Sequence, residues 1–456
     1  MNWDKYLSPE RLRISTREKK QDARNEFESD FGRVIFSPAM RRMHDKTQVF
    51  PLTTDDNIHS RLTHSMEVMS VGHSLAINLC DNKDFIEEIK QNKDKVLREI
   101  PVIIKNACLV HDIGNPPFGH FGETVIQGYF EKLFEKDNIL EEANNHSEKQ
   151  FDLTKVERED FEYFDGNAQG FRLLTKLQVL DDPYGLNLTY ATLGAYLKYP
   201  NTDDKVKLIL SQKKRGVFQS EKSYLATIAK SCGLSLNDKF IRHPLSFIME
   251  AADSICYMVM DIEDGFNKKW FDYAFLKEKL STIPGMPETF NYLDGKFKNE
   301  ITKVVNLRLA LIKKLVIIAE KNFTTNLGSI CEGKYNEELI KDDVNGLAKK
   351  LNNFCAQYIF SHKDIMSLEL TGHSVLTGLL DYYISFCFHK NEAYRSRGVG
   401  LISNSIIRAA LIETKQSSFE DLTDYYKLRV IVDFISGMTD QYALNHFQKL
   451  SGQKIN

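Results

Sequence analysis

Apolar residues recur at every third or fourth position through most of the chain, a spacing typical of one buried face of an α-helix. The strict alternation of apolar and polar residues that marks half-buried strands is scarce. The long helices predicted by this pattern span residues 62–80, 99–111, 241–265, 299–322, 340–360 and 365–388. The predicted fold class is therefore all-α.

The distribution of polar clusters divides the chain softly in two. Prolines stand mostly at predicted helix ends, and no repeat or long linker is found. Convergent polar clusters lie mainly in residues 1–270, whereas residues 271–456 show a plainer amphipathic pattern, so we place a soft boundary near residue 270. Residues 131–165 are polar and rich in acids, which predicts a solvated helix and loop or, alternatively, a flexible flap.

Charge and composition exclude several classes of protein. Lysine and arginine number 60 against 63 acidic residues, a net charge of −3, so no global basic excess favours binding to nucleic acid or lipid. No stretch approaches about eighteen apolar residues and no secretory signal is present, so we expect a cytoplasmic protein with no membrane segment. The 7 cysteines are scattered without a CxxC pair, and we interpret them as small buried apolar side chains.

The His111-Asp112 pair carries the first chemical signal. It closes the apolar run 102–110, so the end of a buried helix is expected to be polar. Buried charge needs a partner, and a divalent cation is one such partner. The alternative is a helix cap in which the histidine and the aspartate bond each other.

Two further residues favour the metal. His64 falls in the first turn of a predicted helix, after Ser60 and Thr63 as capping residues. Asp253 stands inside an otherwise apolar helix, where solvent exposure does not explain a carboxylate. Histidine and aspartate from separate helices form a mixed nitrogen and oxygen site with room for solvent.

The order of His64, His111-Asp112 and Asp253 resembles the H…HD…D signature of the HD-domain phosphohydrolases. Several longer segments resemble, more narrowly, the bacterial deoxyguanosine triphosphate triphosphohydrolases (dGTPases). They are RLTHSMEV, HDIGNPPFGHFGE, FDGNAQGFRLL, GAYLKYP, GVFQSEK and DFISGMTDQYAL. These segments lie between about residues 46 and 444, so the resemblance covers most of the chain.

This resemblance implies an HD-domain catalytic core in residues 1–270, completed by a helical C-terminal region that also forms an oligomer interface. The implied reaction is hydrolysis of dGTP to deoxyguanosine and inorganic tripolyphosphate, which contributes to control of the deoxynucleotide pool. His64, His111, Asp112 and Asp253 would hold Mg²⁺ or Mn²⁺. His120 and Glu123, three residues apart, would form the catalytic pair, with His120 as acid, base or water-positioning residue.

Further residues are expected to bind the substrate. Asp253, Tyr257 and Asp261 fall on one stripe of one helix, so the tyrosine ring would leave little room for a ribose 2′-hydroxyl. The resemblance places Gln48 and Asp261 near the sugar 3′-hydroxyl. The triphosphate needs local cations, for which lysines are candidates, although each is also explained as a surface residue. The other expected substrate-binding residues are Gln48, Arg61, Asn167, Lys198, Tyr199, Lys214 and Arg429, the last of them across a subunit interface. For Asn167 alone, a helix cap is the alternative.

The expected partners follow the same resemblance. They are the dGTP substrate, further copies of the chain in a homo-oligomer such as a hexamer, and single-stranded DNA as an effector. The alternatives are a broad dNTP triphosphohydrolase, another HD nucleotidase that releases orthophosphate, and a nucleotide-sensing or nucleic-acid-binding module with a vestigial site.

Overall fold

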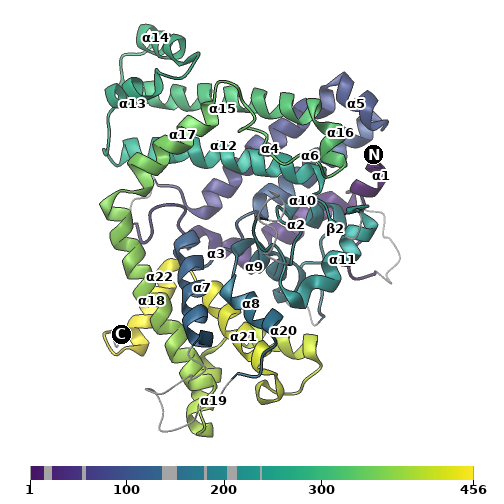
Figure 1. Cartoon of the computed structure of the whole chain (residues 1–456), viewed down its shortest axis with the longest axis vertical. Helices are drawn as coiled ribbons and strands as arrows, with labels where there is room; N and C mark the ends of the chain where they lie inside the picture. Colours follow the sequence, from purple (N-terminus) through teal and green to yellow (C-terminus); the bar gives the residue numbers. More distant parts are fainter. Residues whose placement is uncertain are drawn as a thin grey trace.

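Helices make up most of the computed structural model, which describes residues 2–14, 23–53, 58–135, 151–178, 182–202, 213–236 and 239–454 (Figure 1). The all-α prediction is confirmed, with one short antiparallel pair, β1 (Ser235–Leu236) and β2 (Lys239–Phe240), within the described ranges. The elements before residue 270 are α1 (Trp3–Tyr6), α2 (Glu26–Ile35), α3 (Pro38–Arg42), η1 (Met43–Asp45), α4 (Arg61–Asp81), α5 (Lys83–Ile89), α6 (Lys93–Val110), α7 (Gly119–Glu135), α8 (Lys155–Glu162), α9 (Gly166–Arg172), η2 (Leu173–Leu177), α10 (Tyr190–Tyr196), η4 (Gln219–Glu221), α11 (Lys222–Ser231) and α12 (Pro244–Asn267). Those after it are α13 (Tyr273–Leu280), α14 (Met286–Lys296), α15 (Glu300–Thr325), α16 (Leu327–Cys331), α17 (Leu347–Cys355), η5 (Ala356–Phe360), α18 (Lys363–Cys387), α19 (Glu392–Leu401), α20 (Asn404–Thr414), η6 (Phe419–Asp421), α21 (Asp424–Ser436) and α22 (Asp440–Leu450).

Most predicted long helices begin and end close to their expected positions because capping residues coincide with the limits of the apolar pattern. Ser60 caps α4 and forms a capping box with Thr63, as the sequence predicts. The helix expected over 340–360 begins only at Leu347, because Gly346 adopts a left-handed conformation with φ of 63°. Its end is also modified, since η5 continues it to Phe360 as a π-helix.

Two apolar cores organise the helices. In the first, α4 packs against α6 and α12, and α12 packs against α15. In the second, α18 packs against α7 and α21. Helix α18 contributes Ile365 to the first core and Val375 to the second, and it runs along one side of the molecule past both (Figure 1). Each core contains residues from both sides of position 270, so the boundary expected there does not coincide with a division in packing.

The described parts of segment 131–165 are the end of α7, helix α8 and the residues on either side of α8. Phe134 of α7, Phe161 of α8 and Phe151, which precedes α8, are buried in the second core. Residues 136–150, the middle of the expected flap, lie outside the described residues.

The chain's cysteines confirm their predicted role, since all 7 are buried and free. Within the described part of the chain, no helix is both long and apolar enough to cross a membrane.

Candidate active site

The predicted metal ligands converge from separate helices. His64 lies in the first turn of α4, His111 caps the C-terminus of α6, and Asp253 lies in the middle of α12. Ligand atoms of His64, His111 and Asp112 all lie within 4.8 Å of one another. The Oδ1 atom of Asp253 lies 3.2 Å from His111 Nε2 and 3.4 Å from His64 Nε2. We call these four residues the metal group.

The state of His111 fits a metal ligand. Its Nδ1 lies 2.8 Å from the Cys108 carbonyl oxygen and donates there, so Nε2 is the atom directed at the carboxylates. That Nε2 atom is buried and lies 3.2 Å from Asp253 Oδ1 and 3.6 Å from Asp112 Oδ1. Imidazole nitrogens and carboxylate oxygens brought together from separate helices form a mixed donor set that suits a divalent cation.

Each carboxylate of the metal group is held by a neighbouring cation. Arg61 Nη1 donates to Asp112 Oδ2, and Lys198 Nζ donates to Asp253 Oδ2 at 2.5 Å. Burial raises the pKa of Asp112, but the charges of His111 and Arg61 outweigh burial and bring the pKa below its usual range. In the same way, Lys198 and His111 outweigh burial and hold the pKa of Asp253 well below its usual range. Both carboxylates therefore stay ionised and leave Oδ1 directed toward the histidines.

His120 and Glu123 form the pair expected from their spacing. Both lie in the first turns of α7, where His120 Nδ1 is 3.0 Å from Glu123 Oε2. The His120 side chain is 72% exposed, whereas Glu123 is buried and accepts the Gly166 N–H at 2.8 Å. Lys214 Nζ lies 3.8 Å from Glu123 Oε2 and 3.4 Å from Asp165 Oδ2. The charge of Glu123 raises the pKa of His120.

The backbone before His120 has an uncommon conformation. Phe118 has φ of 63° and Gly119 has φ of 59°, both in the left-handed region. A Cβ atom at Gly119 would lie 2.4 Å from Arg61 Nη2, so this position requires glycine. The turn thus brings the start of α7 directly against the arginine that holds Asp112.

Tyr196 of α10 is within electrostatic reach of carboxylates from the metal group and from the His120 pair. Its hydroxyl donates to the Asn167 carbonyl oxygen at 2.8 Å. Burial, followed by the charges of Asp165, Asp112 and Glu123, raises the pKa of Tyr196 well above its usual value. Both sets of carboxylates therefore act on one ring.

The residues expected near the sugar lie on two sides of the site. Tyr257 and Asp261 follow Asp253 along α12, and the Tyr257 hydroxyl donates to Asn352 Oδ1 of α17 at 3.1 Å. Asp261 is 3% exposed, and burial raises its pKa well above the usual value. Gln48 Oε1 instead accepts from Arg61 at 3.3 Å, beside the metal group.

The remaining substrate-side predictions meet different surroundings. Asn167 donates through its side chain to Asp165 Oδ1 at 2.8 Å, but the cap of α9 is Asp165, so the capping alternative for Asn167 is wrong. Lys198 and Tyr199 follow α10, and burial raises the pKa of Tyr199. Their approach to a nucleotide stays a prediction.

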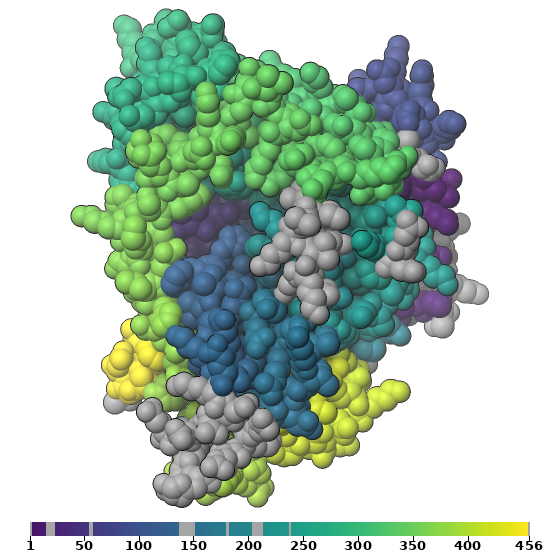
Figure 2. Space-filling model, in the orientation of Figure 1, coloured from purple at the N-terminus to yellow at the C-terminus, as the bar shows by residue number. Residues whose placement is uncertain are grey.

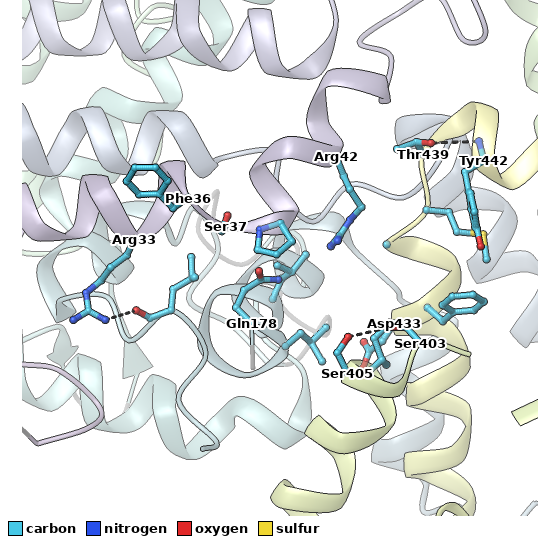
Figure 3. A pocket seen from close by; sticks show the side chains of 18 residues that line it. Arg33, Phe36, Ser37, Arg42, Gln178, Ser403, Ser405, Asp433, Thr439 and Tyr442 are labelled. Atoms are coloured by element: carbon cyan, nitrogen blue, oxygen red, sulfur yellow. Dashed lines mark hydrogen bonds between the residues drawn. The ribbon is translucent and has the colours of Figure 1, made fainter. Parts of the chain in front are cut away.

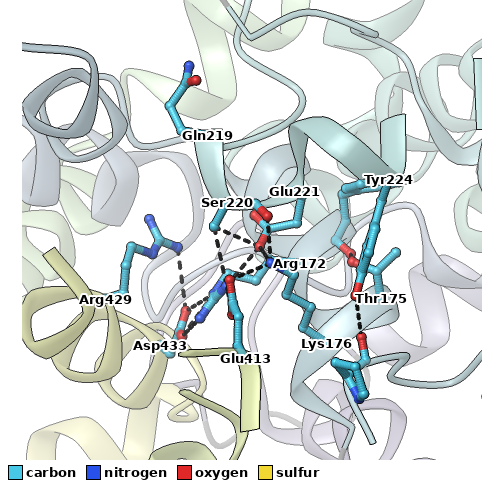
Figure 4. Close-up of polar contacts among 12 residues, drawn as sticks. Arg172, Thr175, Lys176, Gln219, Ser220, Glu221, Tyr224, Glu413, Arg429 and Asp433 are labelled. Carbon is cyan, nitrogen blue, oxygen red and sulfur yellow. Dashed lines mark hydrogen bonds and ion pairs between the residues drawn. The ribbon is translucent and has the colours of Figure 1, made fainter. Parts of the chain in front are cut away.

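Arg429, expected to recognise the nucleotide across a subunit interface, is fully buried in this chain, and that role stays a prediction. It donates to Gln169 Oε1 at 2.9 Å. It also lies 3.4 Å from Asp433 Oδ1 (Figure 4). Its guanidinium stacks on Phe218, 3.9 Å from the ring centre. It belongs to a buried ion cluster whose other members are Arg172, Lys176, Glu221, Glu413 and Asp433.

Sequence reasoning missed two buried charged residues next to the site. Lys46 donates to the Asn115 carbonyl at 2.5 Å, and Asp440 accepts the Phe118 N–H at 2.9 Å. Burial and the charge of Arg42 lower the pKa of Lys46 to about 7. Asp440 falls within the segment DFISGMTDQYAL, whereas Lys46 lies ahead of the first quoted segment, at the start of the region of resemblance. Spacing gave no signal for either residue, because their partners are far away in the sequence.

A cavity of about 700 Å³ lies apart from these groups, where α3, η2, the start of α20 and the α21–α22 junction meet (Figure 3). Its lining is mainly apolar, with Arg42 directed into it. None of the predicted metal, catalytic or substrate-binding residues lines the described part of this cavity. The surface is also hollowed between α7 and the light green residues of α17 and α18 (Figure 2).

Comparison with known proteins agrees with the geometry. Residues 61–165 match the HD domain, and residues 406–449 match the phosphohydrolase-associated domain. The fold and the metal group therefore define an HD-domain phosphohydrolase.

Relatives that align over nearly the full length show which family of HD-domain phosphohydrolases this chain resembles. A deoxyguanosinetriphosphate triphosphohydrolase-like protein of Listeria monocytogenes is 35% identical over 99% of this chain and 100% of its own length. A deoxyguanosinetriphosphate triphosphohydrolase of Salmonella paratyphi A is 33% identical over 99% of this chain and 97% of its own. A like-named protein of Synechocystis is 32% identical over 99% of both chains. The chain belongs to the deoxyguanosinetriphosphate triphosphohydrolase family.

Proposed function

We propose that this HD-domain hydrolase cleaves dGTP to deoxyguanosine and inorganic tripolyphosphate. The observation that carries the proposal is an exposed histidine, His120, held by the buried Glu123 beside a group of two buried histidines and two half-buried aspartates. The names of the full-length relatives support dGTP as the substrate. In a cell this reaction would lower the supply of one deoxynucleotide.

The metal group would hold Mg²⁺ or Mn²⁺ through His64, His111, Asp112 and Asp253. When bound, this cation supplies positive charge that stabilises negative charge on the α-phosphate and acidifies water. Arg61 and Lys198 keep the two carboxylates ionised and oriented, as their contacts with Asp112 and Asp253 indicate.

His120 would move a proton at the scissile bond. Because Nδ1 is committed to Glu123, the atom that exchanges a proton with the 5′-oxygen or the attacking water is Nε2. Glu123 in turn is fixed by the Gly166 N–H, which keeps the ring orientation constant. This arrangement corresponds to a base or acid oriented by a third group.

The substrate would extend from the metal group toward α12 and toward Lys214. Tyr257 and Asp261 would contact the deoxyribose, so a ribose 2′-hydroxyl would meet the tyrosine ring. Lys214 lies beside Glu123 and offers positive charge to a triphosphate. The other residues proposed to bind the nucleotide are Gln48, Arg61, Asn167, Lys198 and Tyr199. Arg429, which is buried in the ion cluster, would act at a subunit interface.

The test is incubation of the purified full-length protein with Mg²⁺ or Mn²⁺ and, separately, each of the four dNTPs and GTP. Chromatography then separates nucleoside, tripolyphosphate and orthophosphate, with His111→Ala as the inactive control. Deoxyguanosine and tripolyphosphate from dGTP alone are expected. Cleavage of all four dNTPs would indicate a broad triphosphohydrolase, and orthophosphate would indicate another HD nucleotidase. No product with any metal, with or without single-stranded DNA, would favour a sensing module.

The proposal includes a homo-oligomer and single-stranded DNA as an effector, which rest on the family resemblance. Light scattering of the purified protein measures the first. Titration with a labelled oligonucleotide measures the second.

A further inference from the structure

Asp440 connects the C-terminal region to two segments that border the site. It is the first residue of α22, is 3% exposed, and directs its carboxylate away from its own helix. Oδ1 accepts the Phe118 N–H at 2.9 Å, and Oδ2 accepts the Thr47 N–H at 2.9 Å. The Thr47 hydroxyl also donates to Oδ2. One buried carboxylate thus accepts three hydrogen bonds from two distant parts of the chain.

The bond to Phe118 fixes the point from which the catalytic helix starts. Phe118 has φ of 63°, a conformation that a bulky side chain seldom adopts unless its surroundings hold it. Its ring is buried in the second core, beside Gly372 of α18. Helix α7 begins at the next residue, so the orientation of the Phe118 peptide sets the direction in which His120 is presented.

The bonds to Thr47 reach the helix that carries His64. Thr47 forms an isolated bridge with Ser60, and the Lys46 carbonyl accepts the Arg61 N–H at 2.9 Å. Because Ser60 caps α4, the segment held by Asp440 lies directly against the start of the helix that carries His64.

Lys46 makes a second connection at the same junction. It is 4% exposed, and its Nζ donates to the Asn115 carbonyl at 2.5 Å and to the Ser436 carbonyl at 2.8 Å. Ser436 is the last residue of α21, so the lysine satisfies a carbonyl at a helix end. The α21–α22 junction therefore holds the turn 115–118 at both of its ends.

We infer that Asp440 is a positioning residue for the reaction, which holds the start of α7, and thereby His120, in register with the metal group. The inference rests on the proposed function. In the structure, Asp440 acts through Phe118 and Thr47 and makes no described hydrogen bond to the metal group.

The test is Asp440→Asn in the full-length protein, assayed with dGTP and Mn²⁺. We expect kcat to fall about 10- to 100-fold, because small displacements of a catalytic group cost rate steeply. The KM for dGTP and the dissociation constant of Mn²⁺ should stay within about threefold of the wild-type values, because the side chains that bind both are untouched. A fall in kcat no larger than that of the control described next would overturn the inference.

Asp424→Asn is the matched control. Asp424 is also the first residue of a helix in the C-terminal region, follows a capping threonine, is 8% exposed, and accepts a distant backbone N–H, that of Asp152, at 3.1 Å. It lies outside the proposed machinery, so its kcat should stay within about twofold of wild type. Where Asp440→Asn does not fold, Thr47→Val removes one of the three donors and should lower kcat about threefold. A wild-type kcat in Thr47→Val would overturn the inference.

Amide hydrogen exchange provides a readout that does not depend on turnover. Asp440→Asn should accelerate exchange in peptides covering residues 44–50 and 111–122, and Asp424→Asn should not. Equal exchange in the two variants would overturn the positioning role, whether or not the wild type hydrolyses dGTP. If the wild type is inactive but the difference in exchange is present, the proposed function fails and the positioning of this turn stands.

Discussion

Replacing Asp253 by asparagine tests the metal group most directly, because the change keeps the shape of the side chain and removes its charge. In the wild type, Oδ1 lies 3.2 Å from His111 Nε2 and 3.4 Å from His64 Nε2, while Oδ2 accepts from Lys198 at 2.5 Å. The substitution therefore removes one metal ligand and leaves one buried lysine without its carboxylate.

The two effects have separable magnitudes. At a free Mn²⁺ concentration about 100 times the dissociation constant, binding stabilises the folded wild type by about 2.7 kcal/mol. Loss of a ligand that weakens binding about 100-fold would reduce this gain to about 0.4 kcal/mol at the same concentration. Without metal, the variant loses at most about 3–5 kcal/mol, because the Lys198 side chain is only 14% exposed and has lost its carboxylate partner.

The assay is thermal and urea unfolding of both proteins with and without Mn²⁺. The expected result is a metal-dependent gain in stability for the wild type that is almost absent in Asp253→Asn. Asp30→Asn is the control, because Asp30 of α2 is also a carboxylate paired with a cation, 2.6 Å from Arg11, and contributes nothing to the metal group. A wild-type metal-dependent gain in Asp253→Asn would refute the assignment of Asp253 as a ligand.

Other predictions concern catalysis, specificity and acid stability. Because Glu123 raises the pKa of His120, the ring stays protonated to higher pH, and Glu123→Gln should move the limb of the pH–kcat profile that His120 controls to lower pH. The alkaline limb moves if His120 acts as an acid and the acidic limb if it acts as a base, while an unmoved profile would contradict the pairing. Tyr257→Ala should lower the ratio of kcat/KM for dGTP over GTP about tenfold, with Tyr257→Phe close to wild type, and an unchanged ratio in Tyr257→Ala would place sugar selection elsewhere. Burial raises the pKa of Glu221, but Lys176 outweighs it and the pKa falls from 4.5 to about 2, so its contribution to stability is present above pH 4.5 and lost as pH falls toward 2. The free energy of unfolding, measured in urea across that pH range, should decline less steeply in Glu221→Gln than in the wild type. An equal decline would show that ionised Glu221 contributes nothing to stability.

The helices could be predicted where the apolar period and a capping residue agree. The pattern located α4 because Ser60 stands at its start, and α18 because its apolar stripe is continuous. It placed the start of α17 too early, because the left-handed conformation of Gly346 depends on the turn that it enters rather than on hydrophobicity. The sharing of α18 between two cores is a tertiary property that no local period records.

The site was predictable where its chemistry is local in sequence. The contact of His120 with Glu123 follows from their spacing on one helix face, and His111-Asp112 stands out at the end of an apolar run. The contacts of Lys46 and Asp440 join residues 69 and 322 positions apart, and no pattern of spacing predicts such pairs. Homology indicated Arg429 by its motif alone, and only the fold shows that it is buried.

The connection between Phe118 and Asp440 has a consequence for the timing of biosynthesis. Asp440 follows Phe118 by 322 residues, and at about 5–20 residues per second a ribosome needs roughly 16–64 s to add them. During that interval the nascent chain already contains His64, His111, Asp112 and His120, but the turn before α7 has no carboxylate to hold it. Interrupted translation would therefore release fragments that carry the HD motif without the contact that anchors the start of α7.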